Sequence, residues 1–552
     1  MQLRPYQAKA KQDIYDAWGR GTLNTLAVLP TGAGKTVLFS DILRDHGGAS
    51  CAIAHRQELV GQISLALARD KVRHRIIGPK SVVKLCVNTH MSEVGASYFD
   101  PSAPCAVAGV DTLVRRKDNL SDWMQSVSLW VQDEAHHVLT DNKWGAAASM
   151  FPNAKGLGVT ATPLRADGKG LGRHADGLFD AMVEGPGMRD LINMEYLTEY
   201  RVFAPPSDLI MVEEPGKSGD WSSKQLRTAA AGSHIIGDVV KHYLKIAPGK
   251  LGVTFATDVE TATDIAEQFN AAGVPAAVVS AKTPDAERIS LLRKFKNREL
   301  LQLVNVDLFG EGFDLPAIEV VSMARPTQSY GLYVQQFGRA LRLLPGKQYA
   351  IIIDHVGNVA RHGLPDAKRE WSLDRREKRS NGPPADAIPV RTCLNLDCLA
   401  VYERVYSACP YCGFVTPPAA RNAPEFVDGD LCELDFATLA QMRGEVERVD
   451  MDKELYREEL AAKHTPKIGQ LAHVKRHVER QEAQAALRHS ISWWAGYQRA
   501  MGRDDSESYK RFYFKFGLDV LSAQALKTKD ALELANKINE HLGGLASGVS
   551  NS

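Results

Sequence analysis

Residues 29–36 carry the sequence LPTGAGKT, in which two glycines, a lysine and a threonine are spaced as in loops that bind phosphate. A short apolar run precedes this segment and apolar residues at helical spacing follow it, so we expect a strand, a glycine turn and a helix. Backbone N–H groups of such a turn converge on phosphate oxygens, while Lys35 supplies positive charge and Thr36 a hydroxyl ligand for Mg²⁺. The residues predicted to hold the phosphates are Thr31, Gly32, Ala33, Gly34, Lys35 and Thr36. Because position 29 is Leu rather than the first glycine of the strict pattern, a chance glycine-rich turn is the alternative.

Two adjacent acids, Asp133 and Glu134, follow a second apolar run at residues 128–131. In an open α/β sheet ligands bind beyond the carboxyl ends of the strands, which is where these acids would lie. We expect Asp133 to hold Mg²⁺ through water, and Glu134 to orient and deprotonate an attacking water molecule. A solvated strand end is the alternative for an acidic pair that stands alone. Together the loop and the acids predict a site that hydrolyses a nucleoside triphosphate.

Four cysteines near residue 400 have a spacing that suits a metal ion. Cys393, Cys398, Cys409 and Cys412 form the pattern C-x4-C-x10-C-x2-C. Four thiolates at such a spacing favour tetrahedral Zn²⁺ with no open coordination position, so the predicted role is structural. The alternative is four free or disulfide-paired cysteines. A reducing cytosol disfavours disulfides. The four-residue gap between Cys393 and Cys398, however, is longer than is usual for a zinc site. The other four cysteines, Cys51, Cys86, Cys105 and Cys432, are expected to behave as small buried hydrophobes.

Short apolar runs alternate with helical patterns over the first 375 residues, which predicts an α/β fold with parallel sheets. We assign residues 1–200 to a first lobe and residues 201–375 to a second. The expected strands are 25–29, 51–54, 105–109, 128–132 and 157–160 in the first lobe, and 253–256, 277–280, 301–306, 319–322 and 350–354 in the second. The glycine-rich stretch 168–187 is expected to be a loop.

Two further domains are predicted beyond a charged linker. A zinc-ribbon-like module should occupy residues 388–418, and a helical C-terminal domain residues 430–552. Within the helical domain, residues 493–516 interleave aromatic and cationic side chains. These aromatics are expected mainly to form the core of the helical domain; the alternative is that they stack on bases while the cations contact phosphates.

In their order along the chain, these motifs resemble those of the superfamily 2 helicases of the DEAD/DEAH type, from residue 3 to about residue 345. The remaining matching segments are residues 3–7, 54–59, 110–113, 160–162, 255–257, 305–307, 311–314 and 335–342. The resemblance implies two tandem RecA-like lobes. Within that group the chain is most similar to RadD-type and prophage-encoded helicases, in residues 29–36, residues 312–314, residues 353–358 and the cysteine cluster.

The resemblance implies roles for several residues around ATP. Arg339 and Arg342 would reach from lobe two to the γ-phosphate as arginine fingers, and their three-residue spacing would place them on one helical face. A surface salt bridge is the alternative for either arginine. The remaining implied ATP contacts are made by Arg4, Gln7, Gly312 and Asp314, with Gln7 reading the adenine edge. Thr160, Thr162 and Gln335 would couple the state of the γ-phosphate to the nucleic acid.

The nucleic acid would cross both lobes on the side opposite ATP, by the same resemblance. Its implied contacts are Arg56, Thr112, Arg115 and Thr257, whose side chains suit phosphates and carry no sequence information. Each could equally cap a loop or be a solvated charge.

Composition places few further limits on function. The chain has 552 residues, a net charge of +1, 44% hydrophobic and 24% charged residues, which are ordinary values for a globular protein. Without a recognisable signal peptide or apolar span, we expect a cytoplasmic protein of a bacterial or phage-infected cell. The favoured function is an ATP-dependent DNA helicase or translocase in replication, recombination or repair. The alternatives are an RNA helicase, a nucleic-acid-stimulated ATPase that remodels complexes without unwinding, and an adaptor role for residues 385–552 that recruits the motor to a partner.

Overall fold

The computed structural model describes residues 2–165, 167–205, 211, 220–306, 318–375, 388–416, 449, 451–462 and 467–549. The chain divides into two compact units. The first contains Met1–Pro384 with Leu399–Val401, and the second contains Ala385–Cys398 with Tyr402–Ser552.

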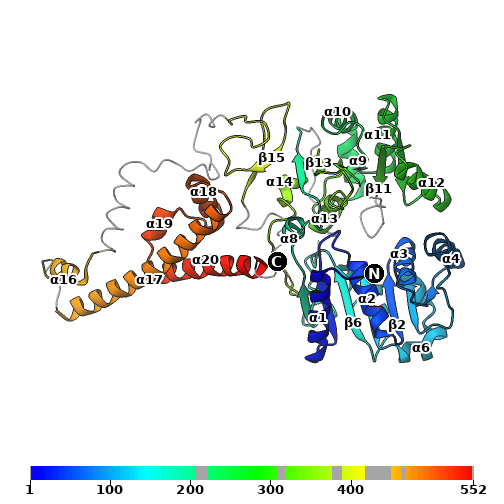
Figure 1. Cartoon of the computed structure of the whole chain (residues 1–552), viewed down its shortest axis with the longest axis horizontal. Coiled ribbons are helices and arrows are strands. Elements are labelled where there is room, and N and C mark those ends of the chain that lie inside the picture. Colours follow the sequence, from blue (N-terminus) through cyan, green and yellow to red (C-terminus); the bar gives the residue numbers. More distant parts are fainter. Residues whose placement is uncertain are drawn as a thin grey trace. The chain divides into compact units, whose positions relative to one another are not determined.

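The first lobe is built on a parallel sheet of seven strands among the described residues, in the order β3-β4-β2-β5-β6-β1-β7. Figure 1 shows two of these strands, β2 and β6, among the helices of this lobe. The strands are β1 (Asn24–Val28), β2 (Ser50–Ala54), β3 (Arg75–Ile77), β4 (Cys105–Gly109), β5 (Leu129–Asp133), β6 (Lys155–Thr160) and β7 (Ala181–Glu184). The flanking α-helices are α1 (Pro5–Gly19), α2 (Lys35–His46), α3 (Gln57–Arg69), α4 (Lys80–Val94), α5 (Val110–Arg115), α6 (Ser121–Ser126), α7 (Lys143–Ala148) and α8 (Met188–Asn193). Since helices cover the sheet, its central strands are apolar along their whole length.

The five strands predicted for this lobe are confirmed to within about two residues. The prediction was wrong for β7, which lies inside the stretch expected to be a loop. This strand has only one buried residue, Val183, so it carries no continuous apolar run. The three-residue strand β3 was also missed, because it is too short to give a pattern.

The second lobe has a parallel sheet of six strands in the part of the chain that is described, in the order β10-β11-β9-β12-β13-β8. Its strands are β8 (Tyr200–Phe203), β9 (Gly252–Phe255), β10 (Ala276–Ser280), β11 (Gln302–Val306), β12 (Val320–Met323) and β13 (Ala350–Asp354). Its helices are α9 (Ser223–Ala231), α10 (Ile235–Ile246), α11 (Val259–Ala271), α12 (Asp285–Lys296), α13 (Tyr330–Gly338) and α14 (Asn358–His362). The fold is therefore the predicted pair of parallel-sheet lobes, although edge strand β8 was not predicted.

The chain returns to the first lobe after the second. Trp371 and Leu373, which the sequence assigned to lobe two, pack against the core of lobe one. The backbone N–H of Gly172 donates to the carbonyl of Leu373 at 2.9 Å. Arg375 and Asp176 form an ion pair at 2.5 Å in the same region. Residues 371–375 thus fasten the end of lobe two to lobe one.

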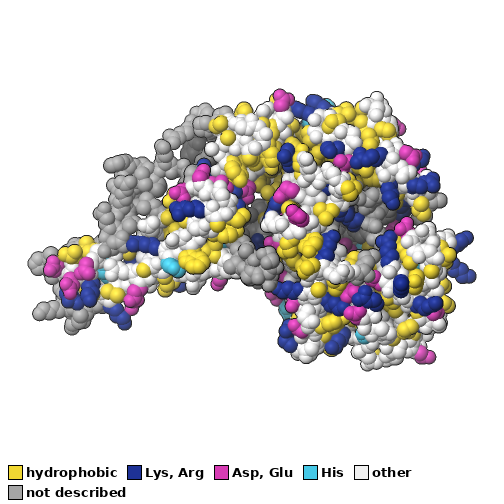
Figure 2. Space-filling view, in the orientation of Figure 1, with side chains coloured by type: hydrophobic (Ala, Val, Ile, Leu, Met, Phe, Trp, Pro, Cys, Tyr) yellow, Lys and Arg dark blue, Asp and Glu magenta, His cyan; other side chains and the backbone are white. Residues whose placement is uncertain are grey.

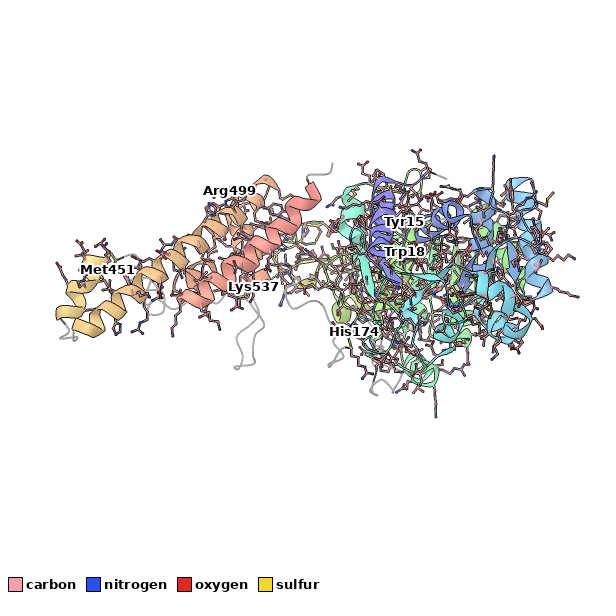
Figure 3. The ribbon with its side chains drawn as sticks, turned by 90° about the horizontal axis from the view of Figure 1, so that it is seen from below. Tyr15, Trp18, His174, Met451, Arg499 and Lys537 are labelled. Carbon is pink, nitrogen blue, oxygen red and sulfur yellow. The ribbon has the colours of Figure 1, made fainter. Side chains whose placement is uncertain are left out.

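The second unit contains most of the cysteine module together with a group of helices, and the division of this region into two domains stays a prediction. The helices are α16 (Lys453–Ala462), α17 (Lys467–Ala500), α18 (Asp505–Phe516), α19 (Val520–Gln524) and α20 (Thr528–Val549). Figure 3 shows Arg499 near the end of α17 and Lys537 on α20. Trp494 packs edge-on against Phe512 and Phe516, with ring centroids 6.0 and 5.2 Å apart. These aromatics are core residues.

Candidate nucleotide-binding and hydrolysis site

The phosphate loop joins β1 to α2 and has the backbone shape that its glycines predict. Gly32 and Gly34 have φ angles of +87° and +75°, a left-handed conformation that only glycine adopts without strain. A Cβ atom at Gly34 would lie 2.5 Å from Nε2 of Gln7, and one at Gly32 would lie 2.8 Å from Cδ2 of Leu197. Both positions therefore require glycine, and the helix that follows points its N-terminal N–H groups into the loop.

Gln7 supports the phosphate loop directly. Its Nε2 donates to the carbonyls of Ala33 at 2.9 Å and Gly34 at 3.3 Å, while its Oε1 accepts from the backbone N–H of Arg4 at 2.9 Å. Tyr6 donates its hydroxyl to the carbonyl of Ala33 at 2.8 Å. The amide that we expected at the adenine edge is thus engaged with the loop, and its reading of adenine stays a prediction.

The two acids lie at the carboxyl end of β5, as predicted. Asp133 is the last residue of the strand, and its Oδ1 accepts from the backbone N–H of Glu134 at 2.9 Å. Glu134 has a φ of +51°, which is uncommon for a residue other than glycine and marks a constrained turn. Both side chains are buried.

Charge is concentrated around these acids. Burial and the neighbouring carboxylate of Glu134 raise the pKa of Asp133 to about 6, whereas Lys35 lowers it. Burial lowers the pKa of Lys35, and the two acids oppose that shift. Carboxylate and hydroxyl oxygens are the ligands that Mg²⁺ takes in proteins, so Asp133 and Thr36 fit this ion.

A chain of contacts links Glu134 to the other lobe and to residues 160–162. Oε2 of Glu134 accepts from Nε2 of Gln335, on α13 of lobe two, at 3.2 Å. Nδ1 of His136 lies 3.5 Å from the same Oε2 and 3.1 Å from the hydroxyl of Thr160. Thr160 in turn donates to the carbonyl of Thr162 at 3.0 Å. The coupling residues that the resemblance implied are therefore close together, and His136, two residues after Glu134, contacts both Glu134 and Thr160.

The arginines of residues 335–342 do not share a regular helical face. Helix α13 ends at Gly338, so Arg339 caps the helix and Arg342 lies beyond it. The expectation that both lie on a helix was wrong, because the chain continues beyond Gly338 in tighter i→i+3 turns, with the N–H of Leu341 donating to the carbonyl of Gly338 at 3.2 Å. Arg339 and Arg342 nevertheless both lie near enough to contribute to lowering the pKa of Lys35.

Lobe two reaches the phosphate loop at Gly338. A Cβ atom at this position would lie 2.7 Å from Cβ of Thr31, so only glycine lets α13 approach so closely. Gly312 and Asp314, the other predicted contacts to ATP from lobe two, lie outside the described residues.

The four predicted nucleic-acid contacts differ in their surroundings. Arg56 is the N-cap residue of α3, and Thr112 and Arg115 lie on α5, with Arg115 exposed. Thr257 is buried, and its hydroxyl donates to Oδ2 of Asp258 at 3.0 Å. This favours the loop-cap alternative for Thr257. Figure 2 shows basic and acidic side chains interspersed on the visible face. A positive electrostatic potential that attracts nucleic acid would therefore be confined to part of the surface.

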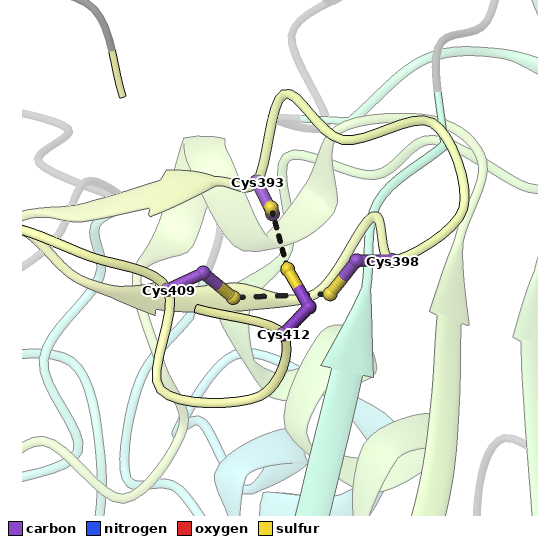
Figure 4. Close-up of side chains that lie close together, drawn as sticks. All are labelled: Cys393, Cys398, Cys409 and Cys412. Atoms are coloured by element: carbon purple, nitrogen blue, oxygen red, sulfur yellow. Dashed lines mark hydrogen bonds between the residues drawn. The ribbon is translucent and has the colours of Figure 1, made fainter. Parts of the chain in front are cut away.

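The predicted metal ligands converge (Figure 4). The sulfur atoms of Cys393, Cys398, Cys409 and Cys412 all lie within 4.8 Å of one another. The Cys393–Cys412 and Cys398–Cys409 sulfur pairs are 3.6 and 3.8 Å apart, too far for disulfides. Gly413, directly after the last cysteine, has a φ of +73°, the conformation expected of glycine in such a knuckle. The arrangement can hold one metal ion with four thiolates.

One cavity of about 410 Å³ lies away from this chemistry. It is lined by Tyr15, Trp18, Ile42, His46, Ser128, Leu129, Asn153 and Lys155. Tyr15 and Trp18 lie close together on α1 (Figure 3), with ring centroids 5.7 Å apart. Because β5 and β6 begin here, the cavity lies at the opposite end of these strands from the acids.

Comparison with known proteins identifies the lobes. A family model described as type III restriction enzyme, res subunit, matches residues 1–165, and one described as helicase conserved C-terminal domain matches residues 236–343. A 51.5 kDa protein of a Lactococcus phage is 32% identical over 394 residues, covering 70% of this chain and 76% of the relative.

Two further relatives carry functional names. A Saccharomyces cerevisiae protein named as an ATP-dependent helicase, IRC3, is 28% identical over 376 residues, covering 64% of this chain and 51% of the relative. A protein of Sulfurisphaera tokodaii named DNA 3'-5' translocase XPB2 is 24% identical over 385 residues, covering 62% of this chain and 79% of the relative. No described helix is long and apolar enough to cross a membrane. The chain belongs to the superfamily 2 helicases, and it is an ATP-hydrolysing helicase enzyme that acts on nucleic acid.

Proposed function

We propose that this chain couples ATP hydrolysis to movement on DNA or unwinding of DNA, in replication, recombination or repair, and that it binds single-stranded or branched DNA. The observation that carries the proposal is the hydrogen bond from Gln335 of lobe two to Glu134 of lobe one. DNA, rather than RNA, is supported by the relative named as a DNA translocase. The phage relative supports a location of this protein in the cytoplasm of a bacterial or phage-infected cell. Membership of the RadD-type subfamily is also part of the proposal.

In the proposed mechanism, lobe one binds and positions the triphosphate. The loop N–H groups and Lys35 contact the phosphates, while Thr36 and Asp133 would hold Mg²⁺, which neutralises phosphate charge. Glu134 accepts a proton from the attacking water. Arg4 would contact adenine. One face of its guanidinium group packs on the ring of Tyr196, 4.7 Å from the ring centroid, and this contact holds the group in place.

Lobe two completes the site. Arg339 and Arg342 stabilise the charge that develops on the γ-phosphate. Gln335 holds Glu134 in its working orientation, so hydrolysis is fast only when the lobes are together. A strand bound across both lobes favours that state and thereby stimulates hydrolysis. Loss of the γ-phosphate weakens the contact between lobes, and the resulting opening moves the enzyme along the strand.

We further propose that the four-cysteine cluster holds zinc. Four sulfur atoms at about 2.3 Å from one zinc ion would lie roughly 3.8 Å apart. Two of the sulfur pairs measure 3.6 and 3.8 Å, which is close to that spacing. Residues 385–552 would present this module and the helices to a protein partner, which a pull-down with that segment tests.

The proposal is tested by measuring ATP hydrolysis with no polymer, with single-stranded DNA and with single-stranded RNA of the same sequence. A forked DNA duplex in the same buffer reports strand displacement. We expect stimulation by DNA that exceeds stimulation by RNA at least tenfold, with displacement that requires ATP. Equal or greater stimulation by RNA would contradict the choice of DNA. Stimulation by DNA without displacement would instead support the remodelling ATPase.

A further inference from the structure

The turn that carries the two proposed arginine fingers contains successive carbonyl groups that need hydrogen-bond donors from outside the turn. Helix α13 ends at Gly338, and the last carbonyls of a helix have no partner within it. Here the carbonyls of Ala340, Leu341 and Arg342 each receive a hydrogen bond from outside residues 335–342. The donors come from two segments that are far apart in sequence.

Lys347 supplies the first set of donors. Its Nζ donates to the carbonyl of Ala340 at 2.7 Å, to the carbonyl of Ile318 at 3.1 Å, and to the carbonyl of Arg342. An ammonium group has three N–H bonds, so all of them are used on backbone acceptors. Lys347 is partly buried, and this burial lowers its pKa to about 8, while Glu319 opposes the shift.

Thr198 supplies the second set. Its backbone N–H donates to the carbonyl of Leu341 at 2.8 Å, and its hydroxyl donates to the carbonyl of Arg342 at 3.3 Å. Thr198 lies in the connection between the lobes, just before β8. The preceding residue, Leu197, lies against the phosphate loop at Gly32. The turn is therefore tied to the same connection that touches the loop.

We infer that Lys347 and Thr198 are positioning residues that hold the turn of residues 339–342 so that Arg339 and Arg342 face the phosphates. This inference rests on the proposed function, because it acts through the two arginines. Neither side chain touches ATP in the proposed mechanism. Their effect is to fix a backbone that would otherwise leave the carbonyls of residues 340–342 without these donors and would shift to satisfy them.

The geometry explains why a lysine suits this position. Three carbonyls converge on one point, and an ammonium group matches them better than a planar guanidinium does. A methionine has a similar length and shape but donates no hydrogen bond. Lys347→Met thus removes the donors while largely preserving the packing of the side chain.

The first experiment measures ATP hydrolysis with saturating single-stranded DNA for Lys347→Met. We expect kcat to fall roughly 10- to 100-fold while KM for ATP stays within about threefold, because misplaced catalytic groups reduce turnover more than binding. Lys347→Arg, which keeps charge and donors, should recover part of the loss. Lys296→Met, at an exposed position on α12 of the same lobe, is the matched control and should behave as wild type.

The second experiment separates positioning from general stability. Lys347→Met is combined with Arg339→Ala and Arg342→Ala, and residual hydrolysis is measured in single-turnover reactions. If Lys347 acts through the arginines, its substitution causes no further loss in this background. A loss by the same factor in both backgrounds would overturn the inference and leave Lys347 as a contributor to folding only.

Two further outcomes decide between this inference and the proposed function. If Arg339→Ala and Arg342→Ala reduce hydrolysis but Lys347→Met does not, the inference is wrong and the proposed function stands. If the arginine variants hydrolyse ATP normally, both are wrong. Should Lys347→Met fail to fold, Thr198→Val replaces it, since it removes only the hydroxyl bond to Arg342; a kcat within twofold of wild type would then overturn the inference.

Discussion

The amide of Gln335 donates to the carboxylate of Glu134 at 3.2 Å, across 201 positions of sequence and from one lobe to the other. The acid that would activate water is thus oriented by a residue of the opposite lobe. A hydrolysis site built in this way depends on how the lobes meet, which is the property that a motor needs.

Glu134→Gln should bind ATP but hydrolyse it poorly. The amide keeps the size of the side chain and cannot accept a proton, so kcat should fall about 100- to 10,000-fold. Fluorescent-nucleotide binding and phosphate release measure the two steps separately. Lys35→Ala provides the contrast, because it should weaken binding as well as turnover. Hydrolysis by Glu134→Gln at the wild-type rate would remove the assignment of the base.

Gln335→Ala should uncouple hydrolysis from nucleic acid. Without the amide, Glu134 loses its hydrogen bond to lobe two, while the lobe-one site that binds ATP is untouched. We expect the stimulation by single-stranded DNA to fall roughly tenfold, more than the DNA-independent rate does. An equal loss in the two rates would show that Gln335 supports the site without responding to the strand.

Gly338→Ala should impair the meeting of the lobes. The added Cβ would lie 2.7 Å from Cβ of Thr31, so helix α13 would have to withdraw from the phosphate loop. We expect kcat to fall about tenfold or more, with thermal stability little changed. Gly237→Ala, on α10 where nothing lies within 4 Å of an added Cβ, is the control. Similar hydrolysis in both variants would contradict the close approach.

A buried pair of histidines in lobe one predicts a loss of stability in acid. Nδ1 of His90 accepts from the backbone N–H of Tyr98 at 3.3 Å, so its Nε2 carries the proton and donates to the hydroxyl of Ser64 at 2.9 Å. Ser64 then donates to Nε2 of His74 at 2.7 Å, and Nδ1 of His74 donates to the carbonyl of Val72 at 2.9 Å. Every ring nitrogen is satisfied only while both rings are neutral.

Burial lowers the pKa of His74 from 6.5 to about 4. Between these values the unfolded chain binds the proton and the folded chain does not, so the stability is complete above about pH 6.5 and falls as pH falls toward 4. The loss approaches about 3 kcal/mol at 1.36 kcal/mol for each unit of pKa. Hydrogen exchange of the backbone amides in α3 and α4, compared at pH 7 and pH 5, measures this loss of stability. His74→Gln should reduce the dependence on pH, and an unchanged dependence would assign it to other groups.

Removal of zinc should destabilise the second unit. Arg511 of α18 is buried and donates to Oε2 of Glu403, which lies within the cysteine module between Cys398 and Cys409, as well as to Glu507 at 2.8 Å. Because this ion pair joins the module to the helices, loss of the metal should lower the unfolding temperature of both. Purified protein should contain one zinc ion for each chain, and the Cys409→Ser substitution should abolish zinc binding. Full stability in Cys409→Ser without metal would contradict a structural zinc.

The sequence predicted those elements whose signals are local. Parallel strands covered by helices read as continuous apolar runs, and this is why β5 and β13 were found. Edge strands β7 and β8 lack such runs because part of each is exposed. The glycines of the phosphate loop and the acid pair were predictable for the same reason, since their chemistry lies in a few adjacent residues.

The contacts between distant segments could not be predicted from residue type. Lys347 has no pattern that distinguishes it from a surface lysine, and only the folded chain shows its ammonium among three carbonyls. The helical spacing of Arg339 and Arg342 was misleading, because α13 ends before both of them. Thr257 matched a motif yet is buried as part of a helix cap.

The most direct test of the two-lobe site is Arg339→Ala, assayed for ATP binding and for hydrolysis in the same preparation with saturating single-stranded DNA. The account predicts an ATP Kd within about threefold of wild type and hydrolysis slowed by roughly 1,000-fold or more, because an arginine finger acts on the transition state rather than on bound ATP. Hydrolysis at the wild-type rate would contradict the claim that lobe two supplies the charge at the γ-phosphate.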